Sequence, residues 1–397
     1  MPAVLVTDGE LRSSLAAVRS LGRAGHAPHV CSVRGASLAG ASRFASGEAQ
    51  VPDPLTQPER FIAAVEDLTR RQAVKVLLPM SDASLLAILS VRDRFTGVHI
   101  PFPQREVFCR VSDKLELLTT AAALGIPVPS QHVLRQRADR VRLGRRSLRF
   151  PLVVKPTRSV TLSPQGAATF GVRYAHQETE LTAILDALPA QAYPVLLQQP
   201  ILGPGLGVFL LRWSDQILAI FSHRRLREKP PSGGVSVYCE STPLDRRLVS
   251  QSIALLEQFG WQGVAMVEYK QQEATGDAYL MEVNGRFWGS LQLAIDAGVD
   301  FPSLLVRAAL GERVSPVRSY EVGVRSRWLW GDVDHLLARL RGARPGLDLE
   351  SAAPSTLAVL WEFLHFWRTR ERMDVWDPLD RRPFIRETLN RLSALGA

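Results

Sequence analysis

The sequence predicts a two-part α/β and α+β protein, with a parallel α/β domain first and a mixed domain after it. Two observations lead to this fold class. The first hundred residues alternate short apolar runs with segments whose apolar residues have helical spacing. Strands separated by short helices in this way indicate a parallel sheet. From Ser112 onward strands follow one another more closely, and two of them are joined by a short polar turn.

The first part contains a regular series of strands and helices. Strands are expected at 3–7, 29–33 and 75–79, and helices at 10–25, at 58–71 and from Ser81-Asp82 onward. The first turn, 7–10, lacks the GxGxxG series, so a dinucleotide site there is weakly indicated. The start of the chain is typical of a buried strand and not of a signal peptide, because it has no basic region and reaches Asp8 early.

The second part begins with a helix that Ser112 is expected to cap and that ends at Gly125. Further strands are expected at 150–156, 195–199, 207–212, 217–222, 263–270 and 278–284, with helices at 177–188, 246–259, 287–297 and 356–367. A loop is expected at 157–171. The last quarter is rich in tryptophan, which favours core or interface packing over an aromatic ligand site.

The composition excludes several classes of protein. Apolar residues make up 46% and charged residues 22%, as in ordinary globular proteins. No apolar stretch reaches the roughly 18 residues that a membrane span needs. The three cysteines are far apart and have no zinc-binding spacing, which favours small core residues in a reduced, cytoplasmic setting.

The net charge is +9, and seven arginines lie between Arg135 and Arg149 with one acid, Asp139. Such a run fits either a nucleic-acid patch or a solvated face near a site for anionic ligands. No helix-turn-helix, zinc-finger or RNP-like pattern accompanies it, so we favour the second interpretation and expect no nucleic-acid partner.

Two carboxylates and an amide are expected on one face of a strand pair. Glu282 and Asn284 are two residues apart on a strand, so their side chains share a face, and Glu268 lies on the preceding strand. These oxygen ligands suit Mg²⁺. Asn284-Gly285 is also a hairpin-turn signal, so a plain strand and turn is the alternative.

Basic residues around this set favour an anionic substrate. Lys155 ends an apolar strand, Lys114 lies in the first turn of a helix, and Arg286 follows Asn284. The expected strand at 217–222 is followed directly by Arg224, Arg225, Arg227 and Lys229. Several cations beside a dicarboxylate metal site indicate a nucleoside triphosphate.

Five segments in this order resemble the ATP-grasp superfamily, most closely its carboxylate–amine ligase branch. They are Ser112-Asp113-Lys114, Phe150–Pro156, Leu197–Gly203, Met266–Lys270 and Glu282–Ser290. The resemblance covers residues 1–310. It implies a Rossmann-like pre-ATP-grasp domain at 1–110 and a two-subdomain ATP-grasp fold at 111–310, with a smaller lid at about 125–200. Residues 311–397 form a tryptophan-rich extension outside the resemblance.

The resemblance also implies roles for individual residues. Lys114 and Lys155 would contact ATP phosphates, and Gln199 and Ile201 would lie on the hinge that binds adenine and ribose. Glu268, Glu282 and Asn284 would hold two Mg²⁺ ions, with Mn²⁺ as a substitute. Arg286 would stabilise the acyl phosphate, and Arg224, Arg225 and Arg227 would lie near the γ-phosphate or the substrate carboxylate. Two positions differ from the usual pattern: Gly285 replaces a proline, and Gln199 replaces a glutamate.

The implied reaction joins a small carboxylic acid to a small amine. ATP would phosphorylate the acid, and the amine would attack the acyl phosphate to give an amide, ADP and phosphate. The alternatives are an ATP-binding regulatory protein without turnover, a carboxylate–thiol ligase or carboxylase, and a nucleic-acid binder. We expect no membrane partner, and the tryptophan-rich end could form a homodimer interface.

Overall fold

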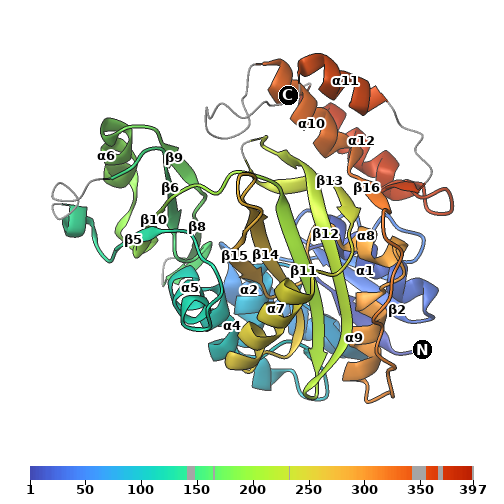
Figure 1. Ribbon diagram of the computed structural model, residues 1–397. Coiled ribbons are helices and arrows are strands. Elements are labelled where there is room, and N and C mark those ends of the chain that lie inside the picture. The colour runs from blue at the N-terminus through green and yellow to red at the C-terminus, as the bar shows by residue number, and fades with distance from the viewer. Residues whose placement is uncertain (141–147, 164–165, 232, 342–354, 365–369, 396–397) are drawn as a thin grey trace.

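The computed structural model describes residues 1–140, 148–163, 166–231, 233–341, 355–364 and 370–395. Figure 1 shows a large twisted sheet at the centre, a smaller lobe to one side of it, and the first domain packed behind it and below. Within the described part of the chain, no helix has the length and apolar character needed to cross a membrane.

The first domain is a parallel four-stranded sheet with the strand order β3-β2-β1-β4. Its strands are β1 (Ala3–Val6), β2 (Ala27–Ser32), β3 (Gly47–Gln50) and β4 (Val74–Leu78), and its helices are α1 (Arg12–Arg23), α2 (Pro58–Arg71) and α3 (Asp82–Leu89). The predicted alternation of strands and helices is confirmed. Asp8, just after β1, accepts hydrogen bonds from Ser81 and Ser84 (2.8 and 2.7 Å), which fixes the start of α3.

Two helices connect this domain to the rest of the chain. They are α4 (Arg105–Ser112) and α5 (Lys114–Ala123). The prediction that Ser112 caps the second helix was wrong, because Ser112 is the last residue of α4. Asp113 is the cap instead: its carboxylate accepts hydrogen bonds from the backbone N–H groups of Leu115 and Glu116. One carboxylate oxygen can accept both bonds, and its negative charge suits the positive end of the helix.

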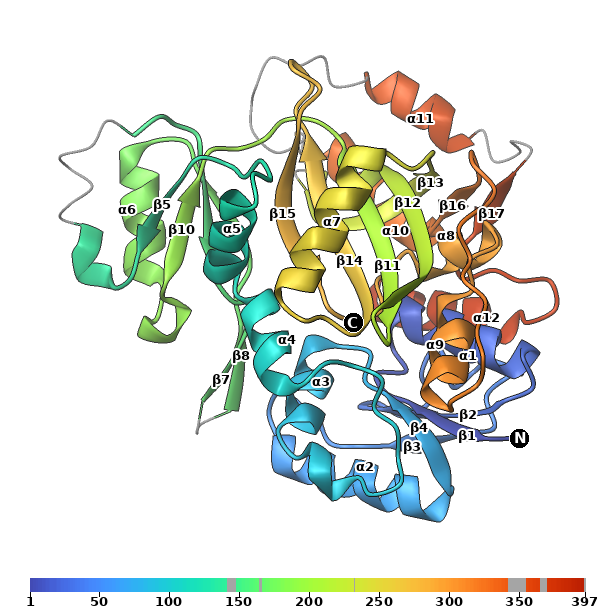
Figure 2. The same ribbon diagram turned by 60° about the horizontal axis from the view of Figure 1, so that its bottom comes forward.

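The smaller lobe is an antiparallel sheet in the order β5-β10-β6-β9, covered by one helix. Its elements are β5 (Gln131–Leu134), β6 (Leu152–Pro156), β9 (Arg173–Ala175), α6 (Glu178–Ala187) and β10 (Val195–Gln198). It has an apolar core of its own, which includes Leu152, Val154 and Leu185. The predicted loop at 157–171 instead contains two short paired strands, β7 (Val160–Ser163) and β8 (Gly166–Thr169), which extend toward α4 (Figure 2).

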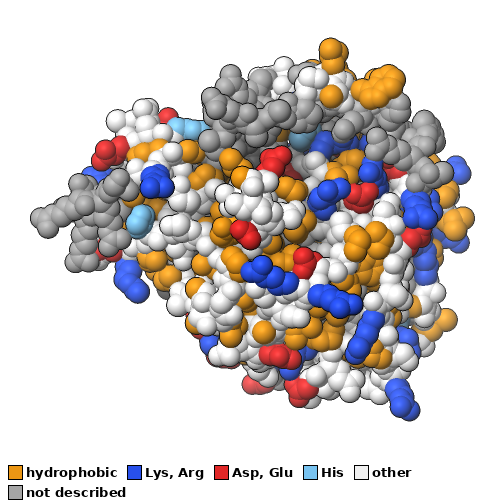
Figure 3. Space-filling view, viewed as in Figure 1, with side chains coloured by type: hydrophobic (Ala, Val, Ile, Leu, Met, Phe, Trp, Pro, Cys, Tyr) orange, Lys and Arg blue, Asp and Glu red, His pale blue; other side chains and the backbone are white. Residues whose placement is uncertain are grey.

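The arginine-rich run begins in this lobe. Arg137 donates hydrogen bonds to the carbonyl oxygens of Asp186 and Leu188 at the end of α6, and Arg140 forms an ion pair with Asp186 (2.5 Å). These arginines therefore stabilise the helix end. Arg142, Arg145 and Arg146 lie outside the described residues. On the face in Figure 3, basic side chains are scattered among acidic and neutral ones.

The central sheet has seven strands in the order β15-β14-β11-β12-β13-β16-β17. They are β11 (Gly205–Trp213), β12 (Gln216–Lys229), β13 (Val235–Ser241), β14 (Gly263–Gln271), β15 (Ala278–Asn284), β16 (Arg325–Arg327) and β17 (Glu371–Met373). The predicted pairing of the strands at 263–270 and 278–284 is confirmed as antiparallel. Arg224, Arg225 and Arg227 lie on β12 itself, and not after a strand as predicted.

Three helices follow or pack beside this sheet: α7 (Arg246–Gln258), α8 (Leu291–Asp296) and α9 (Phe301–Ala309). The helix predicted from Phe287 begins only at Leu291. Phe287 and Trp288 are fully buried, and the Trp288 ring lies 4.4 Å from Phe209 and 5.1 Å from Phe301 between centroids. The burial of these two rings explains why residues 287–290 are not part of α8.

The last quarter of the chain is joined to both larger domains. It contributes β16 and β17 to the sheet, together with α10 (Leu329–Leu340), α11 (Thr356–Leu364) and α12 (Arg382–Leu395). Arg19 of α1 forms a buried ion pair with Asp380 (2.9 Å), and Arg12 pairs with Asp374. The helix predicted at 356–367 corresponds to α11 over residues 356–364, and residues 365–367 lie outside the described part of the chain.

Candidate functional site

Two glutamates lie side by side on neighbouring strands. Glu268 of β14 is the direct register partner of Glu282 of β15. The Glu268 side chain is 13% exposed and that of Glu282 is 33% exposed, so both are partly withdrawn from water. Asn284 follows on the same face and donates a hydrogen bond to Glu282 (3.3 Å). Alternation along β15 and its pairing with β14 thus bring together the three predicted metal ligands.

Two lysines approach Glu282 from other elements. Lys114 Nζ lies 3.3 Å from Glu282 Oε2 and 3.0 Å from the Ser159 hydroxyl. Lys155 comes from β6 of the smaller lobe. Burial lowers the pKa of Lys155 to about 8, although the charge of Glu282 acts in the opposite direction. The two lysines therefore place positive charge beside the glutamates.

The two carboxylates have opposite pKa shifts. Burial raises the pKa of Glu268, Arg225 opposes this rise, and the charge of Glu282 adds to it. Burial also acts to raise the pKa of Glu282, but Lys114 and Lys155 outweigh it and hold that pKa well below its usual range. A bound cation between the two carboxylates would relieve their mutual repulsion. The charges therefore fit a metal site.

Arg225 reaches Glu268 across an intervening strand. Arg225 lies on β12 and Glu268 on β14, yet their side chains are 2.5 Å apart, because β11 between them carries glycine at this point. A Cβ atom on Gly205 would lie 2.9 Å from Cδ of Arg225. Arg225 also pairs with Glu228 (2.7 Å). Gly205 thus provides the space through which Arg225 reaches the dicarboxylate pair.

Arg286 extends in another direction, toward the first domain. Its Nε lies 3.3 Å from Oδ1 of Asp82, at the start of α3, and it donates to the Phe287 carbonyl (3.1 Å). Both side chains remain about a quarter exposed (25% for Arg286 and 29% for Asp82). The pair is accessible and joins residues 204 positions apart in the sequence.

Three other predicted residues make contacts of a different kind. Arg224 pairs with Glu240 of the neighbouring strand β13 (3.1 Å). Arg227 is buried and pairs with Asp332 of α10 (2.6 Å), so it lies away from the glutamates and its predicted role near the phosphates is not supported. Gln199 donates a hydrogen bond to the Arg149 carbonyl (2.7 Å).

A bulge explains the divergence of Arg225 and Arg227. Arg225 pairs with Cys239 and Arg227 with Tyr238, so one extra residue is inserted in β12 between them. Such a bulge re-aims the side chains that follow it. No sequence signal marks it.

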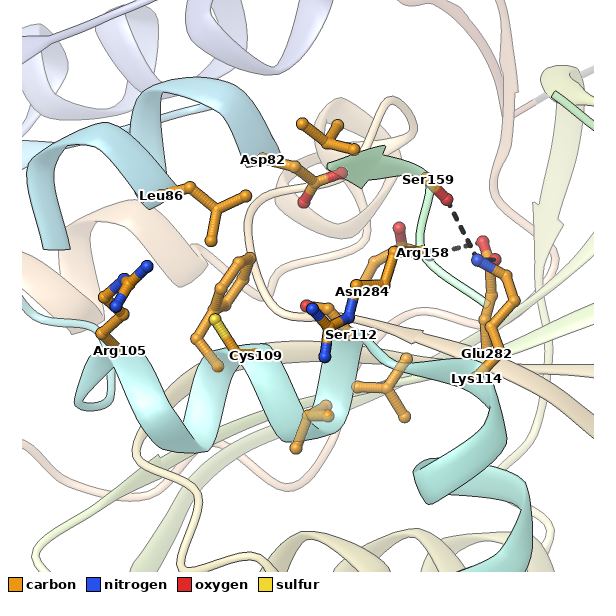
Figure 4. A pocket seen from close by; sticks show the side chains of 14 residues that line it. Asp82, Leu86, Arg105, Cys109, Ser112, Lys114, Arg158, Ser159, Glu282 and Asn284 are labelled. Carbon is orange, nitrogen blue, oxygen red and sulfur yellow. Dashed lines mark hydrogen bonds and ion pairs between the residues drawn. The ribbon is translucent and has the colours of Figure 1, made fainter. Parts of the chain in front are cut away.

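A cavity of about 150 Å³ adjoins Glu282 and Asn284. Figure 4 shows Asp82 and Leu86 of α3 on one side of it, and Glu282 with Lys114 on another. It is lined by residues of α3, α4, α5 and β15 and of the segment that leads into β7, namely Asp82, Leu86, Arg105, Phe108, Cys109, Val111, Ser112, Lys114, Arg158, Ser159, Val160, Glu282, Val283 and Asn284. Sequence reasoning identified Asp82 only as a helix start, because nothing local relates it to Arg286.

Among the described residues, no cluster of three or more His, Cys, Asp or Glu side chains forms a metal site. The predicted set has two carboxylates and one amide, which suits an ion that takes one or two carboxylates and completes its shell with phosphate oxygens and water.

Comparison with known proteins identifies the fold. Residues 193–331 match the family model described as ATP-grasp in the biosynthetic pathway with Ter operon. The solved L-amino acid ligase from Bacillus licheniformis superposes with a TM-score of 0.60 at 16% identity, covering 80% of this chain and 78% of that one. This chain therefore has an ATP-grasp fold. No curated protein sequence matches it.

Two further solved structures resemble this chain. Biotin carboxylase from Campylobacter jejuni, in a β-γ-ATP complex, has a TM-score of 0.62 at 15% identity and covers 81% of this chain and 74% of its own. N5-carboxyaminoimidazole synthetase from Staphylococcus aureus, complexed with ADP, has a TM-score of 0.60 at 13% identity and covers 82% and 80%. At these identities the likeness establishes the shared fold.

Proposed function

We propose that this protein is a Mg-ATP-dependent ligase that joins a small carboxylic acid to a small amine. The acid is activated as an acyl phosphate, and an amide, ADP and phosphate are formed. The observation that carries the proposal is the Glu268–Glu282 pair, with Lys114 and Lys155 beside it and an accessible Arg286 following on the same segment.

The metal ligands proposed are Glu268, Glu282 and Asn284. When bound there, two Mg²⁺ ions, or Mn²⁺ in their place, would neutralise phosphate charge and polarise the bond to the transferred phosphoryl group. The register pairing of the two glutamates supports this assignment, and so does the charge of Glu282, which adds to the rise that burial causes in the pKa of Glu268.

The lysines would bind phosphate. Lys114 and Lys155 reach Glu282 from α5 and from the smaller lobe, so phosphates between the two sheets would meet both. We place adenine and ribose near Gln199 and Ile201, at the end of β10 where the smaller lobe joins the central sheet. Arg224 could reach the substrate only by leaving Glu240.

Two arginines would act on the activated acid. Arg286 has a partly exposed guanidinium that pairs with the cavity-lining Asp82, and a guanidinium can stabilise the charge that develops on the acyl carbon's oxygens. Arg225 is held by Glu268 and Glu228 and would fix the position of Glu268 while offering positive charge to the transferred phosphoryl group. Catalysis would depend mainly on positioning and on charge stabilisation.

The test replaces one proposed ligand. Glu282→Gln keeps the size of the side chain and removes its charge, and we expect ADP release with Mg²⁺, ATP and substrates to fall at least 100-fold. The matched control is Glu273→Gln, in the exposed turn between β14 and β15, which should keep the parent rate. Equal rates for Glu282→Gln and the parent enzyme would contradict the assignment.

A further inference from the structure

We propose that Asp82 binds the ammonium group of the amine substrate and accepts its proton before it attacks. This inference rests on the proposed ligase function and deepens it. At neutral pH a primary amine arrives protonated and has no free electron pair, so it needs a nearby base. Asp82 is a cavity-lining carboxylate on the first domain, outside the proposed metal ligands.

The cavity wall carries three cations, Arg105, Lys114 and Arg158, and two carboxylates, Asp82 and Glu282. Arg158 is paired with Asp113 (3.0 Å), and Lys114 is paired with Glu282. Of the two carboxylates that line the cavity, Glu282 belongs to the proposed metal set. Asp82 therefore remains to attract a cationic ligand.

The contact between Asp82 and Arg286 leaves capacity for a ligand. Its two distances, 3.3 Å to Nε and 3.5 Å to Nη2, are longer than those of tight charge-assisted hydrogen bonds. An ammonium held by Asp82 would thus lie beside the arginine that we assign to the acyl phosphate. The attacking nitrogen and the acyl carbon would be brought together by one ion pair.

The position of Asp82 is fixed by its helix. Asp82 is the first residue of α3, and Ser81 caps that helix by accepting a hydrogen bond from the Ser84 backbone. Asp8 in turn holds the hydroxyls of Ser81 and Ser84. The first domain thus holds the proposed proton acceptor, Asp82, in a fixed position, and this gives the domain a role in the reaction.

The neighbouring wall indicates the kind of amine. Next to Asp82 along α3 lies Leu86, and Phe108 and Val111 of α4 continue the apolar surface. All three are buried, with exposed fractions of 9%, 1% and 1%. We infer that the amine carries an apolar body, as the hydrophobic amino acids do.

The step balances in atoms and charge. The ammonium gives one proton to Asp82, and the freed electron pair of nitrogen forms the C–N bond as the C–O bond to phosphate breaks. Phosphate leaves with the bonding pair and takes a second proton from nitrogen. The third hydrogen remains on the amide, and Asp82 returns its proton to water.

The experiment separates activation of the acid from attack by the amine. Hydroxylamine is largely unprotonated at neutral pH and traps acyl phosphates as hydroxamates without needing an ammonium site. Parent enzyme, Asp82→Asn and the control Asp93→Asn, an exposed residue of the same domain, are each given Mg-ATP, hydroxylamine and a panel of acids. The acid found in this way is then offered the L-amino acids as amines.

We expect Asp82→Asn to form hydroxamate at nearly the parent rate. Its KM for the amine should rise about 10- to 100-fold, the effect of losing one charge-assisted contact. The KM for ATP should not change, and the accepted amines should be apolar ones such as L-leucine or L-phenylalanine. Asp93→Asn should match the parent throughout.

Three outcomes would overturn the inference. Equal loss of hydroxamate and amide in Asp82→Asn would show that Asp82 acts only through Arg286. An unchanged KM for the amine would show that Asp82 does not bind the ammonium group. A preference for amines with acidic side chains would show that the apolar wall does not hold the body of the amine. If the parent enzyme formed no hydroxamate with any acid, the proposed ligase function itself would fail.

Discussion

Two clusters of charged side chains lie on the central sheet and differ in access. The buried cluster, at β12, β16, β17 and α10, contains Arg227, Arg327, Asp332 and Glu371. The site cluster, around β14 and β15, contains Lys114, Lys155, Arg225, Glu228, Glu268 and Glu282. The cations and carboxylates are equal in number in each cluster, but two members of the site cluster, Lys114 and Glu282, line the cavity.

This difference separates structural charges from functional ones. In the buried cluster each side chain is at most 7% exposed, and Arg227 and Arg327 also stack on the Tyr238 ring (4.5 and 4.7 Å). The cluster is neutral and closed, so it needs no ligand. The site cluster borders open space, where Lys114 and Glu282 can meet a ligand.

The largest effect on stability is expected in the buried cluster. Asp332→Asn would remove the carboxylate that pairs with both Arg227 and Arg327. Breaking a buried ion pair in this way destabilises by about 3–5 kcal/mol. Urea unfolding measures the loss. The control Asp215→Asn removes a carboxylate that is 90% exposed and should change stability by less than about 0.5 kcal/mol. Comparable losses in the free energy of unfolding for both variants would contradict the structural role of the buried cluster.

A smaller effect is expected where the site cluster crosses β11. Gly205→Ala would place Cβ 2.9 Å from Arg225 and displace that side chain from Glu268. We expect about 1 kcal/mol of destabilisation, because a flexible side chain can move. ADP release should fall about 10-fold, the effect of about 1.4 kcal/mol on the barrier. Gly171→Ala, which meets open space, serves as the control. Full activity in Gly205→Ala would show that the Arg225–Glu268 contact is dispensable.

The smallest expected effect is a change in the protonation of Lys155. Lys155 has a pKa of about 8 in the folded protein against 10.5 for the free side chain. Because the unfolded chain binds more protons between these values, this group makes the free energy of unfolding increase from about pH 8 to 10.5. Phosphate beside Lys155 would favour the ammonium and raise its pKa, so nucleotide binding near pH 8 should take up about half a proton.

Calorimetry in buffers of different ionisation enthalpy measures this proton uptake. It should vanish near pH 6.5, where Lys155 is already charged, and in Lys155→Met. The exposed Lys75→Met should retain it. Proton release, or uptake that persists in Lys155→Met, would contradict the placement of Lys155 beside the phosphates.

Much of the fold and part of the site could be predicted from local pattern. The period-two alternation of β15 places Glu282 and Asn284 on one face, and the short turn before it makes Glu268 a neighbour. These relations depend on residues close in sequence, so strand geometry settles them. The ATP-grasp motifs added the lysines, which no local rule would have brought to the glutamates.

Other features were decided only by tertiary structure. Arg225 and Arg227 are equivalent in sequence, but a bulge in β12 and the glycine on β11 send one to Glu268 and the other to Asp332. Asp82 meets Arg286 because two domains pack together, and the last quarter of the chain fixes that packing through Arg19 and Asp380.

The sequence by itself therefore determined which side chains share a strand face, because backbone periodicity is local. It could not determine which faces meet, because that depends on packing between segments hundreds of residues apart. The tertiary structure supplied Asp82 to the site and removed Arg227 from it. The chemistry of the site rests on both kinds of relation.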